Sequence, residues 1–186
     1  NADYIFVLDK PVVSEEFIEE VDKLGLTMVW IDHHDLKETI KKDKFKHLYV
    51  YNPSKNKGKD KSDEPVTYLS YKISQRKEDI WLGIIGCIAD HFVPDFAPDF
   101  KKEFPDFWGN VKEPFDAYFS TEIGRVARAL NFGLKDSVTN VVKLQNFLIS
   151  CKNPREVFSE ETGNYPFRKK YYEVKKKYDD LIERAM

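Results

Sequence analysis

The chain has 186 residues, of which 41% are hydrophobic and 15% aromatic, so it can fill a sizeable core in one domain, or in one domain with an extension. Its formal net charge of −2 gives no overall attraction to nucleic acid or anionic lipid, so any basic surface must be local. The longest apolar run is too short to span a bilayer, and the two cysteines lack metal-site spacing, so we expect a cytoplasmic protein with free thiols and no membrane partner.

The first 51 residues predict a parallel β-sheet. Three β-prone segments, at residues 4–8, 27–31 and 48–51, have the length of buried strands. A helix capped by Ser14 and ended by Gly25 connects the first two, which predicts a βαβ unit with parallel strands. The apolar face of this helix should point inward and comprises Phe17, Ile18, Val21 and Leu24.

Acidic residues follow three of the apolar runs. Asp9 follows the first strand, Asp32 follows the second together with two histidines, and Asp90 follows the run at residues 80–89. Because the carboxyl ends of parallel strands meet at one sheet edge, we expect Asp9 and Asp32 to lie together there. Acids at the ends of three apolar runs, one of them joined to two histidines, suggest a convergent site. Carboxylates with one or two imidazoles and no thiolate suit Mn²⁺ or Mg²⁺ better than zinc or iron. A buried histidine pair satisfied by the backbone is the plainer alternative.

These motifs resemble those of the DHH phosphoesterase family, which includes RecJ-like exonucleases, small-oligonucleotide and cyclic-dinucleotide phosphodiesterases and family II inorganic pyrophosphatases. The Asp-His-His triplet at 32–34 matches the name-giving motif, Asp9 matches the single acid that precedes it, and residues 86–90 match the later glycine-to-acid motif. Order and spacing agree over residues 4–95, and the segment 93–107 is similar to archaeal RecJ-like proteins.

One family motif is missing. The sequence His-x-Asp-x-Asp, which ends the family's first strand, does not occur in this chain. We therefore expect the motif to lie upstream in a longer protein, and a divergent member that never had it is the alternative.

The resemblance implies both a fold and a set of roles. The fold would be α/β, a parallel sheet flanked by helices with a mostly helical C-terminal half. Asp9 would bridge two Mn²⁺ or Mg²⁺ ions, with His33 and Asp90 as further ligands of one of them. Asp32 would act mainly by orienting an imidazole, and His34 would contact a phosphate oxygen. The second ion would need the acids of the missing motif.

The C-terminal half carries helical patterns. Ser120 and Asp136 are predicted to cap two helices, and Asn153 begins a capping-box pattern for another. We predict residues 1–164 to be a partial DHH domain and residues 165–186 to be a C-terminal helix. By resemblance this helix leads to an absent nucleotide-binding domain; a helix docked on its own domain is equally compatible.

Lysines gather in two places. Lys55, Lys57, Lys59 and Lys61 alternate along a polar segment at residues 52–65, which predicts a loop. A second basic face lies at residues 168–177. Contact with a phosphate backbone is the functional interpretation of both, and a solvated surface is the alternative.

The resemblance implies a metal-dependent phosphodiesterase acting on single-stranded DNA, single-stranded RNA or short oligonucleotides, as RecJ-like exonucleases do. Two alternatives stay open, namely a non-catalytic scaffold with replication or repair partners and a pyrophosphatase-like hydrolase. A scaffold has no need to keep acids that repel one another without a metal, which favours the enzyme.

Overall fold

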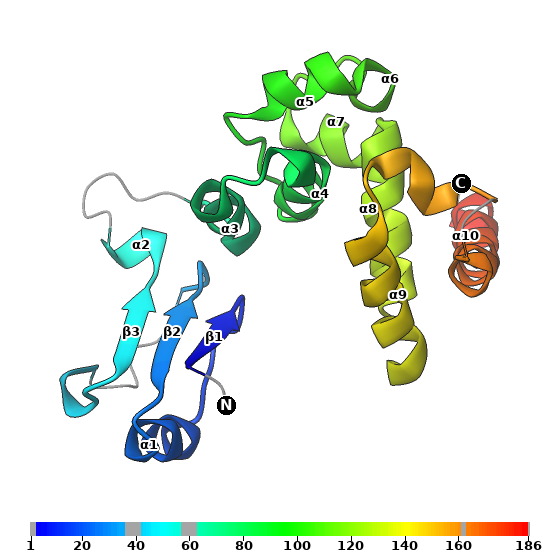
Figure 1. Cartoon of the computed structure of the whole chain (residues 1–186). Helices are drawn as coiled ribbons and strands as arrows, with labels where there is room; N and C mark the ends of the chain where they lie inside the picture. The colour runs from blue at the N-terminus through cyan, green and yellow to red at the C-terminus, as the bar shows by residue number, and fades with distance from the viewer. Residues whose placement is uncertain (1–2, 36–41, 57–62, 161–162, 186) are drawn as a thin grey trace. The chain divides into compact units, whose positions relative to one another are not determined.

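The computed structural model describes residues 3–35, 42–56, 63–160 and 163–185 (Figure 1). They form an α/β structure with a small parallel sheet and a mostly helical remainder, which agrees with the expected fold class at this coarse level. Two compact units, Asn1–Ile73 and Ser74–Met186, make up the chain. This division does not fall at the predicted boundary after residue 164, and the assignment of residues 1–164 to a DHH domain stays a prediction.

The first unit is built on three parallel strands in the order β1-β2-β3. They are β1 (Tyr4–Leu8), β2 (Thr27–Ile31) and β3 (Leu48–Tyr51), as the β-prone segments predict. The register pairs Leu8 with Ile31 and Ile31 with Tyr51, so all three strands end level with one another.

Helix α1 (Glu15–Lys23) connects β1 to β2 and packs on the sheet. Ser14 caps it as predicted, because its side chain accepts a hydrogen bond from the Phe17 backbone N–H. Gly25 follows the helix with φ +69°, a left-handed conformation that glycine adopts without a steric penalty. Ile18 and Val21 are buried beside Met28 and Trp30 of β2.

Two residues predicted to point inward from α1 do not. Phe17 is 47% exposed and Leu24 is 73% exposed. Successive helical residues are about 100° apart around the axis, so Phe17 turns away from the face that Ile18 presents to the sheet. Leu24 is the C-cap and follows the last residue of the helix, so the helical periodicity does not place its side chain on the buried face.

The remaining short elements of the first unit are η1 (Lys42–Lys44), α2 (Pro53–Asn56) and α3 (Val66–Ser74), the last of which ends at the division between the units. The segment 52–65 was expected to be a loop, but α2 begins directly after β3. Pro53 stands at the first helical position, where its fixed φ and missing N–H cost nothing.

The second unit is helical throughout its described part. Its elements are η2 (Lys77–Asp79), α4 (Ile80–Ala89), α5 (Ala97–Glu103), α6 (Pro105–Trp108), α7 (Pro114–Phe119), α8 (Glu122–Gly133), α9 (Val138–Ser150), η3 (Pro154–Phe158) and α10 (Tyr165–Ala185).

Helix α4 is the centre of this unit and packs against α5, α7 and α8. Trp81, Ile84 and Ile88 are fully buried on it. Burial also raises the pKa of the Cys87 thiol to about 12, with a smaller contribution from the negative charges of Asp90 and Asp95. Both cysteines are unpaired thiols, as expected.

Aromatic residues anchor the segment between α4 and α7. Phe100 is fully buried and contacts the Trp108 ring edge-on, with the ring centroids 5.8 Å apart. Helices α7 and α8 come closest at Gly124, where a Cβ atom would collide with the backbone carbonyl oxygens of Ala117 and Tyr118. Glycine is therefore required for this approach.

Two helix starts differ from the predictions by one residue. Thr121, not Ser120, caps α8, and its side chain accepts from the Gly124 N–H. Ser137, not Asp136, caps α9. In both cases two candidate caps are adjacent in the sequence. The residue that caps the helix is the one whose side-chain oxygen accepts a hydrogen bond from the backbone N–H three residues later. Asn153 caps a helix as predicted, and this helix, η3, is of the 3₁₀ type.

The last helix, α10, is docked on its own unit through its first half. Phe167 and Tyr171 are buried and α10 packs against α8 and α9, whereas Leu181 is 64% exposed. A role as a linker to another domain stays a prediction. Among the described residues, no helix combines the length and apolar character that crossing a bilayer requires.

Candidate metal centre

The candidate centre lies at the edge where the three strands of the first unit end. Asp9, Asp32 and Asn52 are the residues that directly follow β1, β2 and β3. Hydrogen bonds continue the strand pairing by one residue, because the Asp9 N–H donates to the Ile31 carbonyl (3.0 Å) and the Asp32 N–H donates to the Tyr51 carbonyl (3.1 Å). The level strand ends therefore align three polar side chains at one edge.

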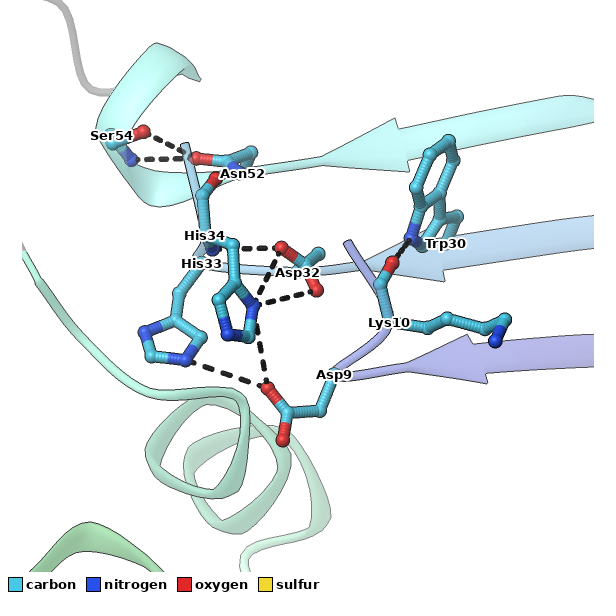
Figure 2. Close-up of polar contacts among 8 residues, drawn as sticks. All are labelled: Asp9, Lys10, Trp30, Asp32, His33, His34, Asn52 and Ser54. Carbon is cyan, nitrogen blue, oxygen red and sulfur yellow. Dashed lines mark hydrogen bonds and ion pairs between the residues drawn. The ribbon is translucent and has the colours of Figure 1, made fainter. Parts of the chain in front are cut away.

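Asp9, His33 and His34 form the only group of potential metal ligands found among the described residues, with one donor atom of each lying within 4.8 Å of the others. The Asp9 Oδ1 is 3.4 Å from His33 Nε2 and 3.9 Å from His34 Nδ1 (Figure 2). The two imidazole centroids are 4.6 Å apart. The sequence prediction that Asp9 and the triplet converge is thus met in space.

Asp32 is fully buried and holds His34 rather than facing solvent. Its Oδ1 accepts the His34 backbone N–H at 2.7 Å, and both carboxylate oxygens lie 3.2 Å from His34 Nδ1 (Figure 2). A carboxylate can only accept, so the ring proton belongs on Nδ1 and the Nε2 lone pair is on the far side of the ring from Asp32. This is the kind of contact that fixes the orientation of a ligating or phosphate-binding histidine.

Asp9 has an unusual backbone conformation. Its φ of 54° lies in the left-handed region, which aspartate tolerates better than most residues. The next residue, Lys10, accepts a 2.8 Å hydrogen bond through its carbonyl from Trp30 Nε1 of β2. This bond ties the turn after β1 to the neighbouring strand, and the Asp9 carboxylate points to the two imidazoles (Figure 2).

Asn52 is a supporting residue that the sequence alone does not single out. It is almost fully buried, and its Nδ2 donates to the His34 carbonyl at 2.8 Å. Its Oδ1 accepts from the Ser54 backbone N–H (3.0 Å) and from the Ser54 Oγ (2.6 Å). The sequence signal for Asn52 is that it directly follows a strand, as Asp9 and Asp32 do.

The donor set fits a divalent transition ion. One carboxylate and two imidazoles combine hard oxygen with borderline nitrogen ligands, a mixture that suits Mn²⁺ better than Mg²⁺, since Mg²⁺ prefers oxygen alone. The exposed Asp9 carboxylate and the partly exposed His34 ring leave the cluster open to solvent. An ion held there would keep coordination positions for water or a phosphate oxygen.

The other predicted site residues are placed as follows. Asp90 is the C-cap of α4 in the second unit, and its part in the metal centre stays a prediction. Lys55 is exposed on α2 and takes part in local interactions, while Lys57, Lys59 and Lys61 lie outside the described residues. The predicted phosphate contacts of these lysines therefore remain predictions.

The two remaining histidines have structural surroundings. His47 contacts Asp22, which accepts the His47 backbone N–H at 2.8 Å and lies 3.1 Å from its Nδ1. These contacts hold the pKa of Asp22 below its usual value, the backbone hydrogen bond being the larger cause. His91 is exposed after α4 and meets the Tyr118 ring edge-on.

The scaffold function of Asn52 can be tested with Asn52→Asp. A carboxylate cannot donate to the His34 carbonyl, so the free energy of unfolding should fall by roughly 1–3 kcal/mol. The control is Asn56→Asp, because the Asn56 Oδ1 accepts the Asn52 backbone N–H, a function that a carboxylate keeps, and its side chain donates no hydrogen bond to any other described residue. Denaturant unfolding measures both. Equal stability of the two variants would contradict the assigned role.

Comparison with known proteins adds no family assignment to this geometry. No family model, no curated protein and no solved structure matches the chain.

Proposed function

We propose that the chain is a divalent-metal-dependent phosphoesterase that hydrolyses phosphodiester bonds in single-stranded nucleic acid or short oligonucleotides, in the manner of RecJ-like exonucleases. The observation that carries this proposal is the cluster of Asp9, His33 and His34 at the carboxyl ends of two adjacent parallel strands, with Asp32 buried beneath His34. Ligand sites in α/β folds are commonly found at this edge.

Asp9 and His33 would hold the cation, since Asp9 Oδ1 and His33 Nε2 already face each other at 3.4 Å. The exposed Asp9 carboxylate would supply negative charge that balances the ion. When bound, a divalent ion acidifies water and neutralises the charge that develops on phosphorus oxygens. Mn²⁺ is the ion that we propose.

Asp32 and His34 would position the substrate. Asp32 accepts both the backbone N–H and the Nδ1 proton of His34, and Asn52 holds the His34 carbonyl, so three contacts fix this residue. The Nε2 of His34 is then directed away from Asp32, where it can meet a phosphate oxygen or join the ligands of the cation. A preoriented ring of this kind costs no reorganisation when the substrate arrives.

The complete enzyme would use more than this cluster. Asp90 would complete the ion held by His33, a second ion would need the acids of a His-x-Asp-x-Asp motif, and Lys55 to Lys61 would contact the strand. We propose these three contributions on the resemblance alone. The cluster on β1 and β2 predicts at least one ion bound by this chain.

The first test of this proposal is metal-dependent stability. Mn²⁺ at a hundredfold excess over Kd should raise the free energy of unfolding by about 2.7 kcal/mol, because the ion binds only the folded cluster. Thermal melts in Mn²⁺ and in chelator measure the difference, which His33→Ala should abolish. His91→Ala is the control, since His91 lies outside the cluster. Coincident parent melts in Mn²⁺ and chelator would rule out the site.

The second test is strand hydrolysis. Hydrolysis of an end-labelled single strand in Mn²⁺ should depend on Asp9, and Asp9→Asn should lower its rate by about a hundredfold or more because the cation loses its carboxylate. Asp32→Asn should cost about 10–100-fold, as expected for a residue that orients a ligand. Asp3→Asn is the control, since Asp3 precedes β1 and lies outside the cluster.

The outcome also separates the alternatives. Release of phosphate from inorganic pyrophosphate with no strand cleavage would favour the pyrophosphatase-like hydrolase. Binding of a strand with no hydrolysis of either substrate would favour the scaffold.

A further inference from the structure

The second unit has a pocket that none of the roles above uses. It has a volume of about 290 Å³ and is lined by three helices of that unit, α7, α8 and α10. This volume lies at the lower end of the range for small-ligand sites, which makes it a site for one nucleoside rather than for a larger molecule.

Aromatic rings dominate the lining. Tyr118 and Phe119 come from the end of α7, Phe132 from α8, and Tyr171 and Tyr178 from α10. The Phe132 and Tyr171 rings are nearly parallel, with centroids 6.3 Å apart, while Phe119 and Tyr178 are 41% and 48% exposed. Exposed ring faces beside a cavity are what proteins use to stack the bases of single strands.

Cationic side chains lie among these rings. Arg128 is placed over both Tyr118 and Phe119, with its guanidinium carbon 5.7 Å from each ring centroid. Arg125 and Lys175 also line the pocket, but their charges are matched by Glu122 and Asp179. Within the described part of the chain Arg128 has no carboxylate partner, and one of its N–H groups donates to the Tyr118 carbonyl.

The pocket therefore combines ring faces with one uncompensated positive charge. A nucleotide presents the complementary pair of features, namely a flat base that stacks on the rings and a phosphate that bonds to the remaining Arg128 N–H groups. An aliphatic ligand would form no ion pair with Arg128, and an isolated anion would not stack on the rings. The lysine-rich face predicted on the last helix reaches the pocket through Lys175.

We propose that this pocket is a subsite for one nucleotide of a single strand, with the base stacked among the Phe119, Phe132 and Tyr178 rings and the adjacent phosphate on Arg128. The choice of a single strand as the ligand rests on the proposed function. The pocket itself belongs to the second unit and does not depend on the metal cluster.

The test is binding of a fluorescein-labelled single strand of about ten nucleotides, which covers more than one stacked base. Anisotropy is measured in chelator, so that hydrolysis cannot interfere. An abasic strand of the same length supplies the phosphates without the bases, and a mononucleotide shows whether one nucleotide suffices.

Tyr178→Ala should weaken binding of the base-bearing strand by about tenfold, the loss expected for one stacked base, and should leave binding of the abasic strand unchanged. Tyr172→Ala is the matched control, because Tyr172 is an exposed tyrosine of the same helix that does not line the pocket. Arg128→Gln should weaken both strands and lower the salt slope by about 0.7. Arg184→Gln is its control on α10. Circular dichroism verifies that each variant is folded.

Three outcomes would overturn the subsite: equal binding of base-bearing and abasic strands by the parent, no binding of either, or equal effects of Tyr178→Ala and Tyr172→Ala. Failure of the proposed function gives a different pattern. A strand that binds through Tyr178 but is never cleaved in Mn²⁺ would contradict the phosphoesterase proposal and support the subsite. Cleavage that is insensitive to substitution of Tyr178 and Arg128 would support the phosphoesterase and contradict the subsite.

Discussion

The level ending of three parallel strands is the constraint on which the candidate centre depends. Because Leu8, Ile31 and Tyr51 are in register, the next residue of each strand reaches the same sheet edge, and hydrogen bonds from Asp9 and Asp32 extend the pairing to that point. A shift of one residue in either strand pair would turn a strand's side chains to the opposite face. The carboxylate of Asp9 and the two imidazoles would then no longer share one donor cluster.

The parts of the fold that could be predicted were those set by local pattern. Strand ends, the Ser14 cap and the aromatic anchoring at Phe100 follow from residue type and spacing. The parts that could not be predicted depend on the choice between adjacent residues or on partners that are distant in the sequence. Ser120 and Thr121 are equally good caps until the backbone shows which oxygen the Gly124 N–H reaches. Phe17 is an apolar residue whose exposure depends on how α1 is rotated against the sheet.

The same division holds for the centre. The order of Asp9, Asp32, His33 and His34 predicted convergence at one edge, because parallel strands impose it. Asn52 could not be ranked above other strand-end residues, since its importance comes from a bond to the His34 carbonyl across the sheet edge. The aromatic and cationic pocket could not be predicted from the sequence for a similar reason. Its rings come from three helices, and only packing at the close contact of Gly124 with α7 and along the first half of α10 brings them together.

The central claim is that Asp9 and His33 bind a divalent cation beside the oriented ring of His34. Pulsed electron paramagnetic resonance of the Mn²⁺-loaded protein, with ¹⁵N-labelled histidine, measures it directly because only a coordinated imidazole couples its nitrogen strongly to the ion. The account predicts nitrogen coupling from His33, which is lost in His33→Ala and unchanged in His47→Ala. A spectrum of Mn²⁺ without histidine coupling, or with couplings that His33→Ala leaves intact, would contradict it.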